Sequence, residues 1–326
     1  MSRLTGITRL APSPTGALHL GNARTFLVNW ALARQRRWRV VLRIEDLDSP
    51  RTKSGADQQA IDMLGWLGLD WDDGPHYQLA DLWPYHRALG ELAERGLIYR
   101  CTCTRSEIAE AQSAPHDEPA VSGDLRYPGT HRPPTAQPTR YAPDEVDAGG
   151  AAIAWRVRVP DEPIAFDDAL QGPQAINVQA DVGDFVVATK SGLPAYQLAV
   201  VVDDARQGVT DIVRGDDLLR SAPRQLLLYD LLGLAPPPGY THLPLVLGPD
   251  GRRLAKRHGD TRLVAYREAG VAAERVVGLL GWWSGVGDKP TEMTAAEFAR
   301  RFDLAALPPE SSVFTQEDEA WLTART

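Results

Sequence analysis

The N-terminal part of the chain carries the pattern that most restricts the fold. Residues Ile7 to Ala11 form a short apolar run, the turn-rich loop PSPTG follows, and His19 to Gln35 has the spacing of a packed helix. A second apolar run, Trp38 to Ile44, ends in the acidic sequence EDLD. Two strands joined through a helix run parallel, so this pattern predicts a doubly wound α/β sheet, in which ligands gather at the carboxyl ends of strands.

Helical and strand-like segments continue to alternate along the chain. Helical spacing recurs at Gly55 to Leu67 and at Leu79 to Arg95, which favours the same parallel sheet. The stretch Ser113 to Pro138 is rich in Pro, Gly, Asp and Ala, and we interpret it as an insertion that carries a small subdomain. Phe185 to Val202 is interpreted as two β-rich pieces joined by a Ser-Gly-Leu-Pro turn. Short helices are expected from Ala295 to Arg325.

The composition limits the class of protein. With 326 residues, 43% of them hydrophobic, the chain is long enough to bury a full core. A formal net charge of -8 argues against a nonspecific nucleic-acid coat, so an RNA partner would need a local basic face. The N-terminus lacks the features of a signal peptide, and no apolar run is long enough to span a bilayer. We therefore expect a cytoplasmic protein of enzyme size, and we also expect it to be a monomer.

The loop PSPTGALHLGN, Pro12 to Asn22, places His19 and Asn22 at the start of the first helix. The free amides of a helix N-terminus attract anions, and an imidazole there adds a donor for phosphate oxygens. Taken alone, the loop is more simply a turn and a capped helix with a surface histidine.

The basic sequence RRLAKR, Arg252 to Arg257, follows a predicted strand at the other end of the chain. In isolation it would be a solvated loop. Combined with a phosphate-binding histidine loop, however, it would act as a lysine clamp on a triphosphate, because phosphoryl and adenylyl transfer depend on positioning and charge stabilisation.

These two motifs resemble the HIGH and KMSKS signatures of class I aminoacyl-tRNA synthetases, with HLGN and RLAKR in their places. The closer resemblance is to glutamyl-tRNA synthetases. It is carried by RLAPSPTGALHLGNAR, LRIEDLDSPR, LPAYQLAVVVDDARQGVTDIVRGDDLL and HLPLVLGPDGRRLAKR, in the order of the family. The resemblance implies a Rossmann-like catalytic domain and the activation of glutamate by ATP.

The resemblance also implies how the reaction would proceed. The carboxylate of glutamate would attack the α-phosphate of ATP, pyrophosphate would leave, and the mixed anhydride would pass to a nucleic-acid hydroxyl without a protein nucleophile. His19, Gly21 and Asn22 would bind the phosphates, and Lys256 would stabilise the departing pyrophosphate. His19, Asn22 and Lys256 are thus the expected catalytic residues, and Mg²⁺ is expected to accompany ATP.

The family positions imply a glutamate pocket as well. Arg9 and Arg214 would bind carboxylates, Glu45 the α-ammonium, and the hydroxyl of Tyr196 would complete the pocket. The other expected contacts follow Arg9 in the chain: Leu10, Ala11, Pro12 and Ser13. Without the resemblance, Glu45 would belong to an ordinary Arg–Glu ion pair and Tyr196 would be a core tyrosine.

A possible metal site begins at Cys101-Thr102-Cys103, which contains both cysteines of the chain. A lone C-x-C pair is a weak signal, more often two buried thiols than a site. Glutamyl-Q enzymes are similar in placing a C-x-C pair ahead of a Y-x-x-x-C element that binds zinc. By that resemblance the ligands of one Zn²⁺ would be Cys101, Cys103, Tyr127 and His131, with His131 replacing a cysteine and His116 as its substitute.

The resemblance implies four parts of the chain. They are the first half of the catalytic domain (1–98), an insertion with a zinc-binding, acceptor-type subdomain (99–184), the second half with the KMSKS-like loop (185–260), and a short helical C-terminal region (261–326).

The number of residues after the RLAKR motif bears on which RNA would accept the glutamate. The 70 residues after Lys256 are too few for an anticodon-binding domain. The arrangement therefore resembles glutamyl-Q tRNA(Asp) synthetases, which transfer glutamate to queuosine at the wobble position of tRNA(Asp). The sequence also fits two alternatives, a minimal glutamyl-tRNA synthetase that charges a tRNA 3′ end and a noncatalytic paralogue.

A surface for RNA is the least defined expectation. Arginines near the insertion form either a basic patch or scattered surface charges: Arg100, Arg105, Arg126, Arg132 and Arg140.

Overall fold

The computed structural model describes residues 6–47, 52–112, 125–252, 254 and 260–324. The chain folds into two compact units that alternate along the sequence. The first unit comprises Met1–Gln78, Val209–Leu218 and Pro238–Thr326, and the second comprises Leu79–Gly208 and Leu219–Pro237. Each unit is therefore assembled from separate segments of the chain.

The first unit is built on parallel strands. The strands are β1 (Ile7–Leu10), β2 (Arg39–Ile44), β3 (Asp73–Tyr77), β9 (Asp211–Gly215) and β10 (Gly239–Leu243). β2 lies between β1 and β3 and is parallel to both, and β9 is parallel to β10. The amide of Thr210 donates a 2.8 Å hydrogen bond to the carbonyl of Ile7, which brings β9 beside β1. The predicted parallel α/β core is confirmed.

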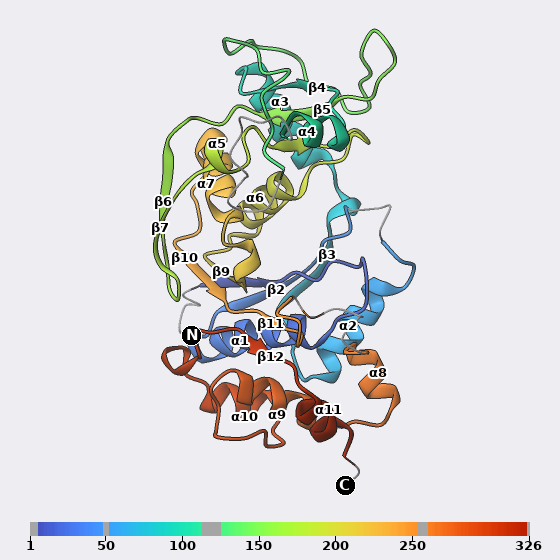
Figure 1. The fold of residues 1–326 in the computed structure, drawn as a ribbon, viewed down its shortest axis with the longest axis vertical. Coiled ribbons are helices and arrows are strands. Elements are labelled where there is room, and N and C mark those ends of the chain that lie inside the picture. Colours follow the sequence, from blue (N-terminus) through green and yellow to red (C-terminus); the bar gives the residue numbers. More distant parts are fainter. Residues whose placement is uncertain (1–5, 48–51, 113–124, 253, 255–259, 325–326) are drawn as a thin grey trace. The chain divides into compact units, whose positions relative to one another are not determined.

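Helix α1 (Leu20–Arg36) connects β1 to β2 and forms the centre of the first unit. Its Leu20, Ala23, Leu27 and Ala31 recur at helical spacing and are fully buried. It packs against α9 (Ala273–Trp283) and α10 (Ala295–Arg301), which lie with it beneath β2 in Figure 1. The remaining elements of this unit are α2 (Ala56–Trp66), α8 (Leu263–Glu268), α11 (Gln316–Thr323), β11 (Val246–Leu247), β12 (Ser312–Val313), and the 3-10 turns η2 (Asp216–Leu218) and η4 (Leu304–Ala306).

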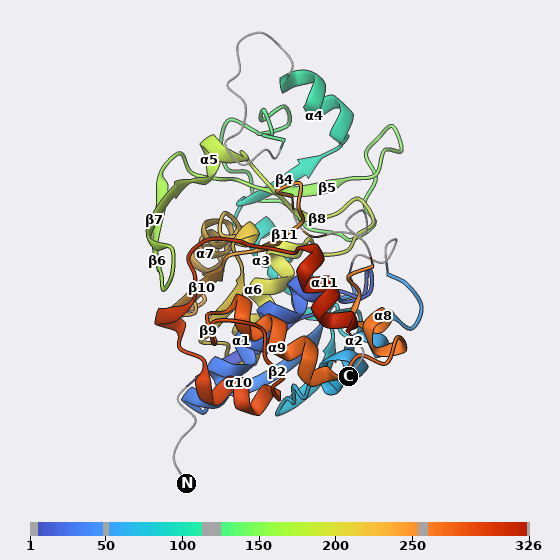
Figure 2. The ribbon, with the colours of Figure 1, turned by 60° about the horizontal axis from the view of Figure 1, so that its bottom comes forward.

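The second unit combines helices with antiparallel strands. Its sheet has the order β4-β5-β8, and β6 and β7 form a separate hairpin, which is the long green ribbon in Figure 2. The elements are α3 (Trp83–Glu94), β4 (Ile98–Cys101), α4 (Arg105–Gln112), β5 (Ala154–Val157), β6 (Pro163–Asp168), β7 (Gly172–Asn177), α5 (Val178–Asp181), β8 (Val186–Ala188), α6 (Tyr196–Gln207) and α7 (Ser221–Leu231). The 3-10 turn η1 (Gln78–Ala80) precedes α3.

The prediction of two β-rich pieces between Phe185 and Val202 is wrong for the second piece. Only the first forms a strand, β8, whereas the second begins helix α6. Leu198 to Val202 are all buried, and a continuous apolar run has no period that separates a buried strand from a buried helix. In the described part of the chain, no helix has the length and apolar character needed to cross a membrane.

Candidate functional site

Three of the predicted glutamate-binding residues lie at one edge of the parallel strands of the first unit. Arg9 is the penultimate residue of β1, Arg214 is the penultimate residue of β9, and Glu45 directly follows β2. Contacts of Ile7 with Thr210 and of Arg9 with Val213 run in the same direction along β1 and β9. Because the strands are parallel, their carboxyl ends and these charged side chains share one edge of the sheet.

Arg9 and Arg214 are almost completely buried, and each donates a hydrogen bond to a neighbouring group. Nη1 of Arg9 donates to the carbonyl of Val213 over 3.4 Å, and Nε of Arg214 donates to Nε2 of His242 over 3.0 Å. Such contacts orient the guanidinium planes, which favours a bidentate contact with a carboxylate.

Glu45 lies 3.4 Å from a guanidinium nitrogen of Arg43, with both side chains largely buried. The ion pair that the sequence allowed for Glu45 is therefore present. Its backbone amide also donates to the carbonyl of Pro12, which ties the end of β2 to the PSPTG loop. In that loop Ser13 is exposed and Pro12 is buried, and Leu10, the last residue of β1, is also buried.

The HLGN segment begins helix α1, with His19 as the residue before its first turn. The backbone amide of His19 approaches Oδ1 of Asn22 at 3.5 Å, so the asparagine closes the helix N-terminus. Gly21 lies within this first turn, next to the His19 ring, where an added Cβ would come within 3.2 Å of ring atoms. A small residue is thus favoured beside the imidazole.

The segment that follows the RLAKR loop is bonded directly to the HLGN segment. The amide of Leu20 donates to the carbonyl of Thr261 over 3.1 Å, and the amide of Leu263 donates to that of Leu18 over 2.9 Å. These bonds form an antiparallel bridge between His19 and Arg262. The HLGN segment and the segment that follows the RLAKR motif, far apart in the chain, are therefore joined in the first unit.

The beginning of the RLAKR loop is also defined. Gly248 donates to the carbonyl of Arg252 over 2.7 Å, and Leu254 donates to that of Val246 over 3.1 Å. Lys256 itself lies outside the described residues. Its role as a clamp stays a prediction.

A cavity of about 450 Å³ lies between these segments of the first unit. Its walls come from the HLGN loop, from the start of α2, and from both flanks of the RLAKR loop: Gly16, Ala17, His19, Lys53, Ser54, Gly55, Ala56, Gln59, Leu254, Asp260, Thr261 and Arg262. This volume is in the range of small-molecule sites.

Tyr196 belongs to the second unit, where it is the first residue of α6. Its side chain is 39% exposed, so the interpretation of a core tyrosine is wrong. Its participation in the glutamate pocket stays a prediction.

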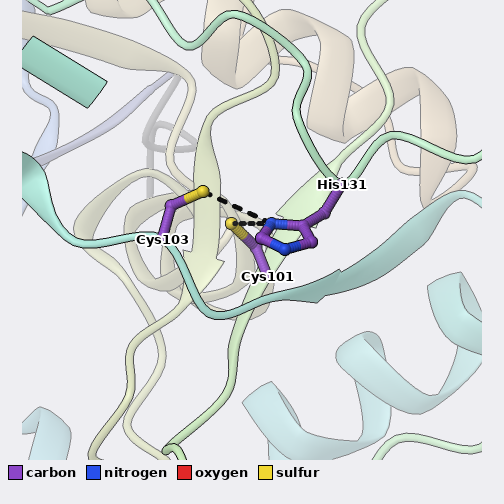
Figure 3. Close-up of side chains that lie close together, drawn as sticks. All are labelled: Cys101, Cys103 and His131. Carbon is purple, nitrogen blue, oxygen red and sulfur yellow. Dashed lines mark hydrogen bonds between the residues drawn. The ribbon is translucent and has the colours of Figure 1, made fainter. Parts of the chain in front are cut away.

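Three of the predicted metal ligands meet in the second unit, as Figure 3 shows. Cys101 ends β4, Cys103 lies in the following loop, and His131 comes from the segment before β5. Nδ1 of His131 lies 3.6 Å from Sγ of Cys101 and 3.3 Å from Sγ of Cys103. Tetrahedral zinc with ordinary bond lengths places a sulfur and a nitrogen ligand about 3.6 Å apart, so the donor set and its spacing fit Zn²⁺.

Tyr127 lies against the same cluster. Its hydroxyl is 3.6 Å from Sγ of Cys101 and accepts a 2.8 Å hydrogen bond from the amide of His131. This contact positions the histidine. The substitute ligand His116 lies outside the described residues.

Arg156 on β5 supplies positive charge to the cluster, a role that the sequence analysis missed. Its Nε donates to Sγ of Cys101 over 3.3 Å, and its guanidinium lies 3.9 Å from the centre of the Tyr127 ring. Burial acts to raise the pKa of Cys101, but contacts with Tyr127 and Arg156 lower it to about 7. A thiolate is the form that binds metal. In the sequence, the feature that could have indicated this role is an arginine in an otherwise apolar strand.

The arginines near the insertion do not act alike. Arg100 pairs with Glu145, Arg132 pairs with Asp184, and Arg126 donates to the carbonyl of Gln179, so these three have structural partners. Arg105 and Arg140 are exposed.

Comparison with known proteins identifies the chain. The sequence model for "tRNA synthetases class I (E and Q), catalytic domain" matches residues 7–321. A glutamyl-Q tRNA(Asp) synthetase of Symbiobacterium thermophilum is 46% identical over 326 residues, which cover 98% of both chains. The chain belongs to the glutamyl-Q tRNA(Asp) synthetase family. A second glutamyl-Q tRNA(Asp) synthetase, from Rhodopirellula baltica, is 47% identical over 84% of this chain and 83% of its own.

Glutamyl-Q tRNA(Asp) synthetases share their catalytic fold with the longer glutamate–tRNA ligases. The ligase of Geotalea uraniireducens is 37% identical over 97% of this chain but over only 65% of its own length. The crystal structure of a glutamate tRNA ligase from Elizabethkingia meningosepticum in complex with its amino acid has a TM-score of 0.76 at 26% identity, and covers 97% of this chain and 68% of that one. The class I catalytic fold is thereby shown.

Proposed function

We propose that this chain activates L-glutamate with ATP and transfers it to queuosine at the wobble position of tRNA(Asp). Membership in the glutamyl-Q tRNA(Asp) synthetase family supports the activity and the acceptor. The observation that carries the chemistry is the bridge between His19 and Arg262, because it places the HLGN segment against a flank of the RLAKR loop around one cavity.

In this proposal the sheet edge binds the amino acid. Arg9 and Arg214 bind carboxylate groups of glutamate, and Glu45 binds its ammonium group in addition to its contact with Arg43. Leu10, Ala11, Pro12 and Ser13 line the pocket, and the hydroxyl of Tyr196 completes it. Orientation of the α-carboxylate toward the α-phosphate is then the main contribution of these residues to the rate.

The ATP contacts follow from the two motifs. His19, Gly21 and Asn22 bind the phosphates at the N-terminus of α1, where the helix dipole favours an anion. Lys256 neutralises the charge that develops on the leaving pyrophosphate. Magnesium accompanies ATP and supplies further charge neutralisation.

The second unit holds one Zn²⁺ in this proposal, with Cys101, Cys103, Tyr127 and His131 as its ligands. The support is the mutual spacing of the donor atoms of Cys101, Cys103 and His131, all within 4.8 Å, and the lowered pKa of Cys101. A bound metal would join β4 to the segment before β5 and so stabilise the second unit.

The deciding experiment is transfer of labelled glutamate to purified tRNA(Asp) with queuosine, to tRNA(Asp) without it, and to tRNA(Glu). Label on queuosine-containing tRNA(Asp) alone is the expected result. Label on tRNA(Glu) would instead establish a minimal glutamyl-tRNA synthetase. Absence of label from every tRNA would support a noncatalytic paralogue and overturn the proposal.

A further inference from the structure

Lys53 lines the cavity beside the HLGN segment, although it belongs to neither sequence motif. It lies three residues before helix α2, on the side of the cavity that the start of this helix forms. His19 and Arg262 contribute to other walls of the same cavity. A lysine in this position faces the space that a ligand held by the HLGN segment would share.

The backbone holds Lys53 in place at the cavity. Its amide donates to the carbonyl of Pro14 over 3.1 Å, which fastens the residue to the PSPTG loop. Its carbonyl accepts from the amide of Ala56 over 3.1 Å, which connects it to the first turn of α2. The side chain therefore extends from a backbone that is fixed on both sides, so little ordering of the chain opposes binding.

Lys53 and Arg262 are both cations that line the cavity, but they differ in their ion pairs. Arg262 is already paired with Asp260, through two hydrogen bonds from its guanidinium to the carboxylate. For the ammonium of Lys53, the described residues provide no carboxylate partner. Although the net charge of the chain is -8, the ammonium group of Lys53 favours an anionic ligand at this position.

We propose that Lys53 binds a phosphate group of a substrate in this cavity, as a subsite next to the HLGN segment. The ammonium donates to phosphate oxygens as a point charge on a flexible stem. Because His19 and both flanks of the RLAKR loop line the cavity, the polyphosphate of ATP is the favoured source. A backbone phosphate of the tRNA has the same chemistry and is the other source. This inference rests on the proposed function for the identity of both substrates.

The test compares Lys53→Gln with the wild-type full-length protein, first by direct ATP binding in equilibrium dialysis. Glutamine keeps most of the length of the side chain and removes its charge. We expect Lys53→Gln to raise the ATP dissociation constant about tenfold, as for loss of one charge-assisted hydrogen bond. Lys53→Arg should restore most of the affinity, because it keeps the charge.

The matched control is Lys289→Gln, which removes an exposed lysine of the first unit and changes the net charge equally. Its ATP affinity should remain that of the wild type. If ATP binding is unchanged in Lys53→Gln but binding of tRNA weakens and the salt slope falls by about one, the phosphate comes from RNA and the subsite stands. Changes below twofold in both measurements would overturn it.

This design separates the subsite from the proposed function. ATP binding requires neither turnover nor the right tRNA, so it reports on Lys53 even if the wild-type protein transfers no glutamate. Conversely, glutamate transfer by the wild-type protein tests the proposed function whatever Lys53 does.

Discussion

Nη1 of Arg24 on helix α1 donates a 2.7 Å hydrogen bond to the carbonyl of Pro244, two residues before β11. The same guanidinium donates to the carbonyl of Trp283 over 2.9 Å and approaches the hydroxyl of Ser284 at 3.3 Å. The side chain is only 2% exposed. It therefore joins the HLGN helix, the end of α9 and the segment that leads to the RLAKR loop.

Replacement of Arg24 by methionine should destabilise the first unit by about 3 kcal/mol, because two buried carbonyls lose their hydrogen bond from the guanidinium. Urea unfolding followed by circular dichroism measures the change. Arg300→Met, which alters an exposed arginine on α10, should remain near the wild-type midpoint. Equal midpoints for the two variants would contradict the role of Arg24.

Replacement of Cys103 by serine should remove zinc from the purified protein, because it takes away one of three converging donors. Metal analysis should find about one equivalent in the wild type and much less in the variant. His131→Cys is the matched control, since it keeps a strong ligand at that position and should retain the metal. Wild-type protein purified without zinc, and as stable as after zinc addition, would refute the site.

Replacement of Tyr85 by phenylalanine should destabilise the second unit by about 1–3 kcal/mol. The hydroxyl of Tyr85 donates to the buried carboxylate of Asp203 at 2.8 and 2.9 Å from its two oxygens. The measurement is a double-mutant cycle, in which urea midpoints are compared for the wild type, Tyr85→Phe, Asp203→Asn and the double variant. We expect the double variant to lose less than the sum of the single losses, and strict additivity would disprove the interaction.

His86 should make the second unit less stable in mild acid. Burial lowers the pKa of His86 below its usual 6.5, against the opposing charge of Asp144, and its Nδ1 lies 3.1 Å from the hydroxyl of Tyr141. The folded state thus disfavours the protonated ring. The resulting stability is complete above the unfolded pKa of about 6.5 and is lost as pH falls toward the folded pKa.

The measurement is the urea midpoint at pH 7.5 and pH 5.5 for the wild type and for His86→Asn, which does not titrate. We expect a smaller drop in the variant than in the wild type. A drop of the same size in both would show that His86 does not contribute.

The parallel core was predictable because its pattern is local. The strand–loop–helix–strand unit from Ile7 to Ile44 is visible in the spacing of apolar residues, and β1, α1 and β2 form there. Helix α6 was missed because its apolar run is buried and has no distinguishing period. The contact of β1 with β9 depends on hydrogen bonds across about 200 residues, which no local pattern contains. The four-part division of the chain stays a prediction.

The site residues were predictable where a motif names them. His19 and the flanks of the RLAKR loop do meet, and Cys101, Cys103 and His131 do converge. Lys53 and Arg156 were not predicted, because a single lysine or arginine carries no motif and acquires its position only through the fold. The roles of Lys256 and Tyr196 stay predictions.

The alternation of the two units along the sequence has a consequence during synthesis. All segments of the second unit leave the ribosome before Pro238, whereas β1 receives its neighbour β9 only when residues around Thr210 have been added. At roughly 5–20 residues per second, the 203 residues between Ile7 and Thr210 take about 10–40 s to synthesise. During that time β1 lacks its contact with Thr210, and its uncovered edge is open to pairing with other nascent chains. A chaperone that shields short apolar segments should therefore raise the yield of this protein more than that of a protein whose sheet closes in sequence order.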